Sequence, residues 1–387
     1  MPTSSVKDPG YGQESELEVR LRSAVQFFQQ RAPVIFVSHH YEYWDQHGFV
    51  QQSLAKELVK WGIPVEWYDG AHWKKKNIVK NWDSSLLKVS KLPCLPLRRF
   101  PWVESINPLV QSQFIQTQLK KGEKPLLWIQ SGLDERVVER LPYVDVFSVF
   151  DDPYLHAPNG NLSSLAQLIV TQNSFTLELF QKHQKSKAIY LPPPVEMEPP
   201  SFDDQTEYLL PESFPKRTMG YIGSFFSDGF DLILFENFIR SFPDWGFILC
   251  GRTDALGLAK IQSWKSYKNF LYVPWVPRKK VGALWRKLKV NLMLYRPASV
   301  SDGAFPVKFL EALYYRVPSL TTQVPKTSSL EGIIPRLTFP DQLKIEAIKL
   351  VNFSSGSLDN LYQKFSLNMS PQWHLIQVAE RLQQKGI

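Results

Sequence analysis

Short apolar runs recur along the whole chain. Segments whose apolar residues have helical spacing predict helices over residues 14–30, 107–121, 135–141, 175–183, 232–242, 278–288, 342–351 and 372–384. In the first half the runs cover residues 33–38, 63–68, 125–130, 144–150, 168–171 and 188–191. In the second half they cover residues 219–223, 245–250, 269–276 and 290–295. Consecutive apolar residues over this length are typical of strands that are buried on both faces of a parallel sheet. The pattern therefore predicts an α/β fold in which strands and helices alternate.

A proline-rich stretch interrupts this alternation near the middle of the chain. Its prolines are Pro192, Pro193, Pro194, Pro199, Pro200, Pro211 and Pro215. Because 387 residues are many for a single hydrophobic core, two domains are expected. We predict a first domain over residues 1–195, a linker over 196–217, a second domain over 218–370 and a C-terminal helix over 371–387.

The segment after the last apolar run predicts a ligand-binding loop followed by a helix. The loop contains Asp302 and Gly303, and Pro306 suits the first position of the helix. Free backbone N–H groups at such a helix start, one turn from Lys308, are suited to phosphate. Glu311 follows about one turn later, where an ionised carboxylate can accept two hydrogen bonds from ribose hydroxyls. The same spacing also fits a solvated ion pair between Lys308 and Glu311, and both interpretations stand.

Two other strand ends of the second half carry residues that could contact a nucleotide. Gly223 and Ser224 follow one apolar run, where a small-residue turn allows a pyrophosphate to approach the backbone closely. Arg252 follows the next run, and its guanidinium could reach phosphate oxygens or simply lie at the surface. No Gly-x-Gly-x-x-Gly is present, which argues against an enzyme that uses NAD or FAD.

In the first half, polar side chains follow two of the apolar runs. His39, His40 and Asp45 come after the run that ends at residue 38, and Asp151 and Asp152 come after the run that ends at residue 150. Ligands of open parallel sheets bind beyond the carboxyl ends of the strands, so these residues are candidates for acid–base chemistry. Asp152 also precedes a proline, which fits a turn without a catalytic role.

Three histidines within nine residues, the last of them His47, raise the question of a metal site. No second cluster of Cys, His or carboxylate residues supplies the remaining ligands of a closed site. The sequence therefore predicts no metal.

The order of strand, small-residue loop, Pro306-x-Lys308-x-x-Glu311, helix and Pro318 resembles the donor-site signature of GT-B glycosyltransferases. The resemblance extends over residues 33–384 and is greatest to bacterial transferases of cell-surface polysaccharides, including the teichuronic-acid type. It implies two Rossmann-like domains that face a cleft, with the C-terminal helix crossing back to the first domain. It also implies that Lys308 and the loop amides hold the diphosphate, that Glu311 binds the ribose, and that Trp275 and Val276 lie against the nucleobase.

The chain departs from the family pattern at three places. Asp302-Gly303-Ala304-Phe305 stands where many retaining members have Glu-Gly-Phe-Gly, and Ser224 stands where an arginine is common. Pro193-Pro194 replaces a frequent Asn-Gly. The donor base, the donor sugar and the stereochemical outcome are therefore left open.

The resemblance implies an enzyme that moves a hexose-type sugar from a nucleotide-diphosphate donor to a hydroxyl of a glycan or a lipid-linked glycan. No cofactor besides the donor substrate is expected. A nucleotide-sugar epimerase of the same fold and a non-catalytic sugar-nucleotide binder in a polysaccharide assembly complex are the alternatives. Nucleic acid is not an expected partner, because the basic residues are dispersed and no known reading motif appears.

Charge and cysteine content indicate where the protein is located in the cell. The net charge is +8, which favours anionic partners, and only Cys94 and Cys250 occur, which indicates no disulfide framework. Residues 1–16 lack the apolar core of a signal peptide, so a cytoplasmic protein is expected. Aromatic and basic residues mix in Trp73–Trp82 and Leu92–Trp102, which predicts an interfacial patch at the inner face of the plasma membrane unless the tryptophans belong to the core.

Overall fold

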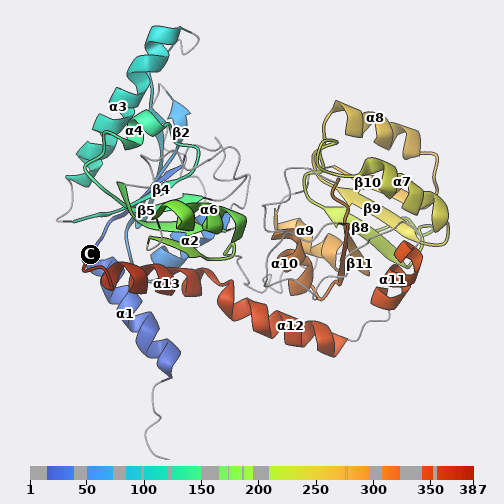
Figure 1. Ribbon diagram of the computed structural model, residues 1–387. Helices are drawn as coiled ribbons and strands as arrows, with labels where there is room; N and C mark the ends of the chain where they lie inside the picture. Colours follow the sequence, from blue (N-terminus) through green and yellow to red (C-terminus); the bar gives the residue numbers. More distant parts are fainter. Residues whose placement is uncertain are drawn as a thin grey trace, which may run out of the picture.

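The computed structural model describes residues 15–38, 50–72, 84–96, 100–120, 124–149, 165–172, 174–184, 187–194, 209–274, 276, 278–296, 307–322, 342–351 and 355–387. Within them the chain forms two parallel sheets flanked by helices (Figure 1). The α/β class and the two-sheet architecture predicted from the apolar runs are thereby confirmed.

The first sheet has seven strands in the order β3-β2-β1-β4-β5-β6-β7. The strands are β1 (Val34–Ser38), β2 (Val65–His72), β3 (Leu87–Pro93), β4 (Leu126–Gln130), β5 (Val144–Val149), β6 (Ala166–Thr171) and β7 (Ala188–Tyr190). The accompanying helices are α1 (Glu16–Gln30), α2 (Val50–Lys60), α3 (Pro101–Leu119), α4 (Glu135–Val138) and α6 (Ser174–Gln184). Every residue of β1, β4 and β5 is buried, because helices cover both faces of the sheet.

The second sheet has five strands in the order β10-β9-β8-β11-β12, with β8 in the middle. The strands are β8 (Thr218–Ile222), β9 (Gly246–Cys250), β10 (Phe270–Val273), β11 (Val290–Met293) and β12 (Ser319–Thr321). The helices are α7 (Leu232–Ser241), α8 (Ala255–Trp264), α9 (Arg278–Trp285), α10 (Val307–Tyr314) and α11 (Gln342–Val351). Aromatic side chains from α7 and α8, including Phe235 and Trp264, fill one face of this sheet, and Trp285 of α9 packs on the other.

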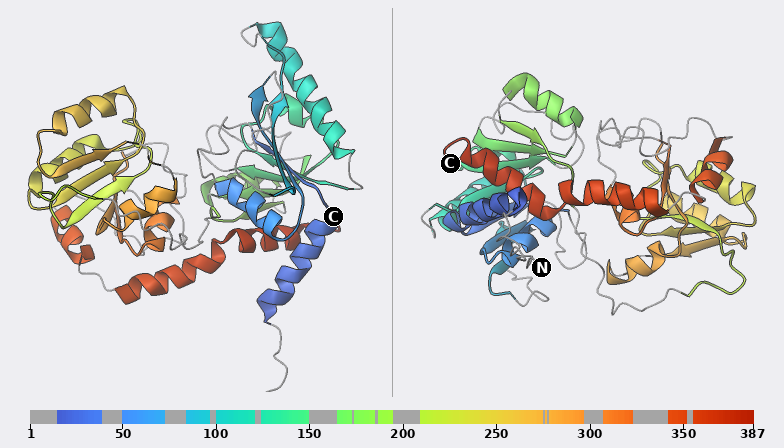
Figure 2. Two further views of the ribbon diagram at one scale, coloured as in Figure 1. Left: turned by 180° about the vertical axis from the view of Figure 1, so that it is seen from behind. Right: turned by 90° about the horizontal axis from the view of Figure 1, so that it is seen from below.

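The last two helices run from the second sheet back to the first (Figures 1 and 2). α12 (Ser355–Asn368) contacts α10, and α13 (Pro371–Gln383) contacts α1, α2 and β6. The buried apolar residues of α13 belong to the core of the first sheet: Leu375, Ile376, Val378, Ala379 and Leu382. Ser370 caps the helix by accepting a hydrogen bond from Trp373 N–H, and Pro371 occupies its first position. A C-terminal helix that crosses back is therefore present.

Several elements differ from the expectations drawn from the sequence. β3 was not predicted, and it buries Leu92, so the expected interfacial segment Leu92–Trp102 is partly core. α3 begins at Pro101, six residues before the expected start at Asn107. α8 and α12 were also missed. No helix within the described ranges is long and apolar enough to cross a bilayer.

The contact of α13 with the first domain predicts a pH-dependent stability. His374 is 2% exposed, and burial lowers its pKa to about 3. A hydrogen bond to the Pro192 backbone raises the pKa but does not offset the effect of burial. The unfolded chain therefore binds one more proton than the native chain between about pH 3 and about pH 6.5. Stability from this group is present above pH 6.5 and is lost as the pH falls.

We expect the free energy of unfolding of the wild-type protein to drop by about 1.4 kcal/mol more than that of His374→Gln between about pH 7.5 and about pH 5.5. Chemical denaturation followed by circular dichroism at both pH values measures this double difference. An equal pH dependence of the two proteins would contradict a buried neutral His374.

Candidate functional site

The carboxyl ends of β8 and β9 approach each other through two glycines. The Gly223 N–H donates to the carbonyl oxygen of Cys250 (2.9 Å), and the Gly251 N–H donates to that of Val273 (3.1 Å). A Cβ atom on Gly251 would lie 2.0 Å from the carbonyl oxygen of Gly223. No side chain fits there, so the two loops run with their backbones in contact.

The loop after β8 is tied to both neighbouring strands. Asp254, which caps α8, accepts hydrogen bonds from the backbone N–H and the hydroxyl of Ser227 and from Gly257 N–H. The Ser227 hydroxyl is the main reason that the pKa of Asp254 lies below its ordinary value. On the other side, Arg296 donates to the carbonyl oxygen of Ser227 (2.9 Å). The loop is thus held in one position above the middle of the sheet.

Lys308 and Glu311 lie on α10, which follows β11 in the chain. Their side chains form an ion pair of 2.7 Å and are only 29% and 22% exposed. The ε-carbon of Lys308 lies 2.9 Å from the point where a Cβ on Gly223 would be. The structure therefore brings together Gly223, Lys308 and Glu311, three residues predicted to contact the donor.

Two tyrosines that the sequence pattern did not indicate border this pair. Tyr221 and Tyr295 are hydrogen-bonded to each other, and the negative charge of Glu311 acts on Tyr221. Burial is the main reason that the pKa of Tyr221 is well above its ordinary value, and burial also raises the pKa of Tyr295 to about 12. Both phenols stay protonated at neutral pH. Their positions at strand ends could have identified them from the sequence, because Tyr221 lies two residues before Gly223 and Tyr295 lies just after β11.

The arrangement has the chemistry of an anion site. Lys308 supplies a partly shielded cation, and Gly223 removes the side chain that would block the approach of a phosphate. A phosphate that binds Lys308 would compete with Glu311 for the ammonium group. Glu311 would then be free to accept hydrogen bonds from neutral hydroxyls. The part of the chain that the structure describes contains no group of three His, Cys, Asp or Glu side chains that could hold a metal.

The other predicted donor residues are spread around this centre. Ser224 follows Gly223, Arg252 is exposed in the loop after β9, and Val276 is partly buried against the apolar cluster on the α9 side of the sheet. Trp275, Asp302 and Gly303 lie outside the described residues.

The five predicted catalytic residues also lie outside the described residues: His39, His40, Asp45, Asp151 and Asp152. The segments that contain them follow β1 and β5, the two strands that flank β4. Parallel strands end at the same edge of a sheet, so both segments start from neighbouring points.

Two buried amides at this edge of the first sheet were missed. Gln130 ends β4 and Gln172 follows β6, and each is 4% exposed. The Nε2 atoms of both lack a hydrogen-bond partner in the structure. A buried donor without a partner costs stability, so these two N–H groups are available to a ligand at the carboxyl edge.

Comparisons with solved structures find the same fold in other proteins. A lipopolysaccharide outer core galactosyltransferase shares 10% identity with a TM-score of 0.58, over 92% of this chain and 99% of that one. Sucrose-phosphate synthase from Thermosynechococcus elongatus shares 13% identity with a TM-score of 0.61, over 91% and 97%. A trehalose-6-phosphate protein from E. coli bound with UDP-2-fluoro glucose shares 10% identity with a TM-score of 0.57, over 91% and 97%.

These likenesses show that the chain has the GT-B fold over nearly its whole length. No protein-family model matches the sequence, and a search of curated protein sequences finds no significant match.

The close contact between Gly223 and Lys308 predicts the effect of one added methyl group. In Gly223→Ala the new Cβ would meet the end of Lys308 (2.9 Å) and the hydroxyl of the buried Tyr221 (3.0 Å), at a φ of +158° that side chains rarely adopt, so the variant should lose about 1 to 3 kcal/mol of stability. Displacement of the ammonium group should weaken nucleoside-diphosphate binding by about tenfold, measured by calorimetry. Gly229→Ala is the control in the same loop, because its nearest neighbour is 4.0 Å away. Equal nucleotide affinities of the two variants would contradict the placement of Lys308 over the ligand.

Proposed function

We propose that this protein is a glycosyltransferase that moves a sugar from a nucleotide-diphosphate donor to a hydroxyl of a glycan or lipid-linked acceptor in polysaccharide biosynthesis. The observation that carries the proposal is the Lys308–Glu311 pair, which lies over Gly223 at the carboxyl ends of β8 and β11. The GT-B fold supports it, because the solved structures of this fold include a galactosyltransferase, a sucrose-phosphate synthase and a trehalose-6-phosphate protein bound with UDP-2-fluoro glucose.

On the donor side, Lys308 binds the diphosphate and Glu311 binds the ribose hydroxyls. In the reaction, the acceptor oxygen bonds to the anomeric carbon of the sugar while the bond from that carbon to the phosphate oxygen breaks. The leaving nucleoside diphosphate keeps the electron pair and gains negative charge, which the ammonium group of Lys308 stabilises. The sugar thereby passes from phosphate to hydroxyl without a redox change.

No metal or cofactor has a role in this proposal, because Lys308 and backbone N–H groups neutralise the leaving diphosphate. Ser224, Arg252, Trp275, Val276, Asp302 and Gly303 complete the donor site.

The first domain supplies the acceptor side. The acceptor hydroxyl must lose a proton, and the candidates that accept or orient it are His39, His40, Asp45, Asp151 and Asp152. The buried amides of Gln130 and Gln172 lie at the same edge of the sheet and are suited to acceptor hydroxyls. We further propose that the enzyme works in the cytoplasm, at the inner face of the plasma membrane, where a lipid-linked acceptor would be found.

Removal of Glu311 tests the donor assignment. Because a charged hydrogen-bond partner typically contributes about 1.5 to 3 kcal/mol, Glu311→Ala should weaken nucleoside-diphosphate binding by roughly ten- to a hundredfold. Lys308→Ala should act in the same direction. A thermal-shift screen of nucleoside diphosphates identifies the base, and calorimetry then gives the affinities.

Glu346→Ala is the matched control, because Glu346 and Lys349 on α11 also form an i,i+3 ion pair of 2.7 Å. Its nucleotide affinity should equal that of the wild type. Full nucleotide affinity in a folded Glu311→Ala protein would overturn the assignment of the ribose to Glu311.

Single alanine variants of His39, His40, Asp45, Asp151 and Asp152 test the acceptor side. At least one should lower turnover by about a hundredfold, as expected for a lost acid–base group, while nucleotide affinity stays unchanged. Release of nucleoside diphosphate from a sugar nucleotide in the presence of acceptor measures turnover. Normal turnover in all five would place the chemistry elsewhere. A changed sugar without acceptor would instead indicate an epimerase, and binding without release would indicate a non-catalytic binder.

A further inference from the structure

α3 exposes a stripe of large apolar side chains over its first three turns. Trp102, Ile106 and Leu109 are 63%, 39% and 45% exposed. Residues four and three positions apart lie on one face of a helix, so the three side chains form a continuous surface. Phe100, which precedes the helix, is also exposed. We call these three helical residues the α3 stripe.

The opposite face of α3 is buried although much of it is polar. Asn107, Gln111 and Ser112 are each less than a tenth exposed, and the Asn107 side chain accepts a hydrogen bond from Leu95 N–H (2.7 Å). The usual arrangement of a surface helix, with apolar residues inward and polar residues outward, is therefore partly reversed here. Packing within the first domain does not explain the outward apolar residues.

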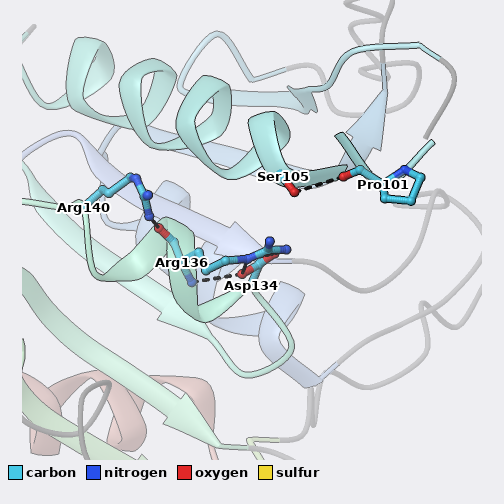
Figure 3. A network of polar contacts seen from close by, with 5 residues as sticks. All are labelled: Pro101, Ser105, Asp134, Arg136 and Arg140. Atoms are coloured by element: carbon cyan, nitrogen blue, oxygen red, sulfur yellow. Dashed lines mark hydrogen bonds and ion pairs between the residues drawn. The ribbon is translucent and has the colours of Figure 1, made fainter. Parts of the chain in front are cut away.

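The neighbouring short helix closes one side of α3 without covering the stripe. Gln116 of α3 donates to the carbonyl oxygen of Arg140, and Arg140 donates to that of Arg136. Figure 3 shows both arginines along one side of α3. At the start of that helix, Ser105 donates to the carbonyl oxygen of Pro101 (3.0 Å). Figures 1 and 2 show α3 reaching beyond the end of the sheet. The stripe thus lies on a projecting element that a flat surface could reach.

The sequence next to the stripe favours an anionic surface. Arg98 and Arg99 directly precede it in the chain, and Glu104 is the only charged residue of α3 itself. Tryptophan prefers the headgroup region of a bilayer, aliphatic side chains prefer the acyl boundary below it, and flanking basic residues are attracted to anionic lipids.

We propose that the α3 stripe inserts into the interface of an anionic lipid bilayer and seats the first domain on it. The α3 stripe would be the surface that holds the protein at the membrane under the proposed function. Membrane binding through the stripe does not depend on the donor site. Its test measures no transfer activity, so failure of the transferase proposal and failure of this one are distinguishable.

The experiment is sedimentation of the full-length protein with vesicles of phosphatidylglycerol mixed with phosphatidylcholine. The triple variant Trp102→Gln, Ile106→Gln and Leu109→Gln should reduce the partition coefficient by about tenfold or more. Because the three side chains are exposed, the variant should fold, which circular dichroism checks. The matched control is Ile233→Gln, Leu256→Gln and Leu258→Gln, three similarly exposed residues of α7 and α8, and it should bind like the wild type. Lys308→Ala should also bind like the wild type.

A second readout locates Trp102. Lipids with brominated acyl chains should quench part of the tryptophan fluorescence of the wild type, and Trp102→Phe should lose this part while it still sediments with the vesicles. Equal binding of the triple variant and the wild type, or no wild-type binding to anionic vesicles, would overturn the proposal. A wild-type dimer in analytical ultracentrifugation that the triple variant abolishes would make a second copy the occupant and would overturn it as well.

Discussion

The backbone contact between Gly223 and Gly251 is the constraint on which the donor end of the second sheet depends. A Cβ on Gly251 would lie 2.0 Å from the Gly223 carbonyl oxygen, so any other residue would force the two loops apart. Gly223 leaves the space that the side chain of Lys308 occupies. Without this contact the cation from α10 could not lie against the end of β8. The close approach of backbone and cation is what makes this point suitable for a phosphate.

The Lys308–Glu311 ion pair balances its own charge while no ligand is bound. Both side chains are partly shielded from water, and the phenols of Tyr221 and Tyr295 beside them are protonated and carry no charge. A pair with this exposure contributes modestly to stability, since attraction and desolvation nearly offset each other. A ligand that offers a phosphate to the lysine and hydroxyls to the glutamate can therefore replace the pair at small cost.

α13 and α3, which both pack on the first domain, differ in which of their residues are buried. α13 turns its apolar residues inward, and its polar face is held by Arg20, which pairs with Glu380 at 2.6 Å and lies over the ring of Trp373. α3 instead buries polar residues beside Val103, Ile115 and Leu119 and exposes the large apolar residues of the α3 stripe. α13 thereby ties the end of the chain to the domain, whereas α3 leaves part of its apolar surface exposed.

The sequence by itself determined the elements whose evidence is local. β1, β4 and β5 were predicted because strands buried on both faces are apolar at every position. Lys308 and Glu311 were predicted as a pair because their spacing on one helix is a local property. β3 was missed because an edge strand mixes buried and exposed residues, and α8 was missed because its Gly257, packed against Thr253, weakens the helical pattern.

Tertiary structure alone decided which distant residues meet. The order of strands in the second sheet places β8 between β9 and β11, and this order brings Gly223, Gly251 and Lys308 together from three separate segments. The face of α3 that points to water was decided in the same way. Helical periodicity shows that Trp102, Ile106 and Leu109 share a face, but only the packing of the helix on its sheet determines whether that face is inside or outside.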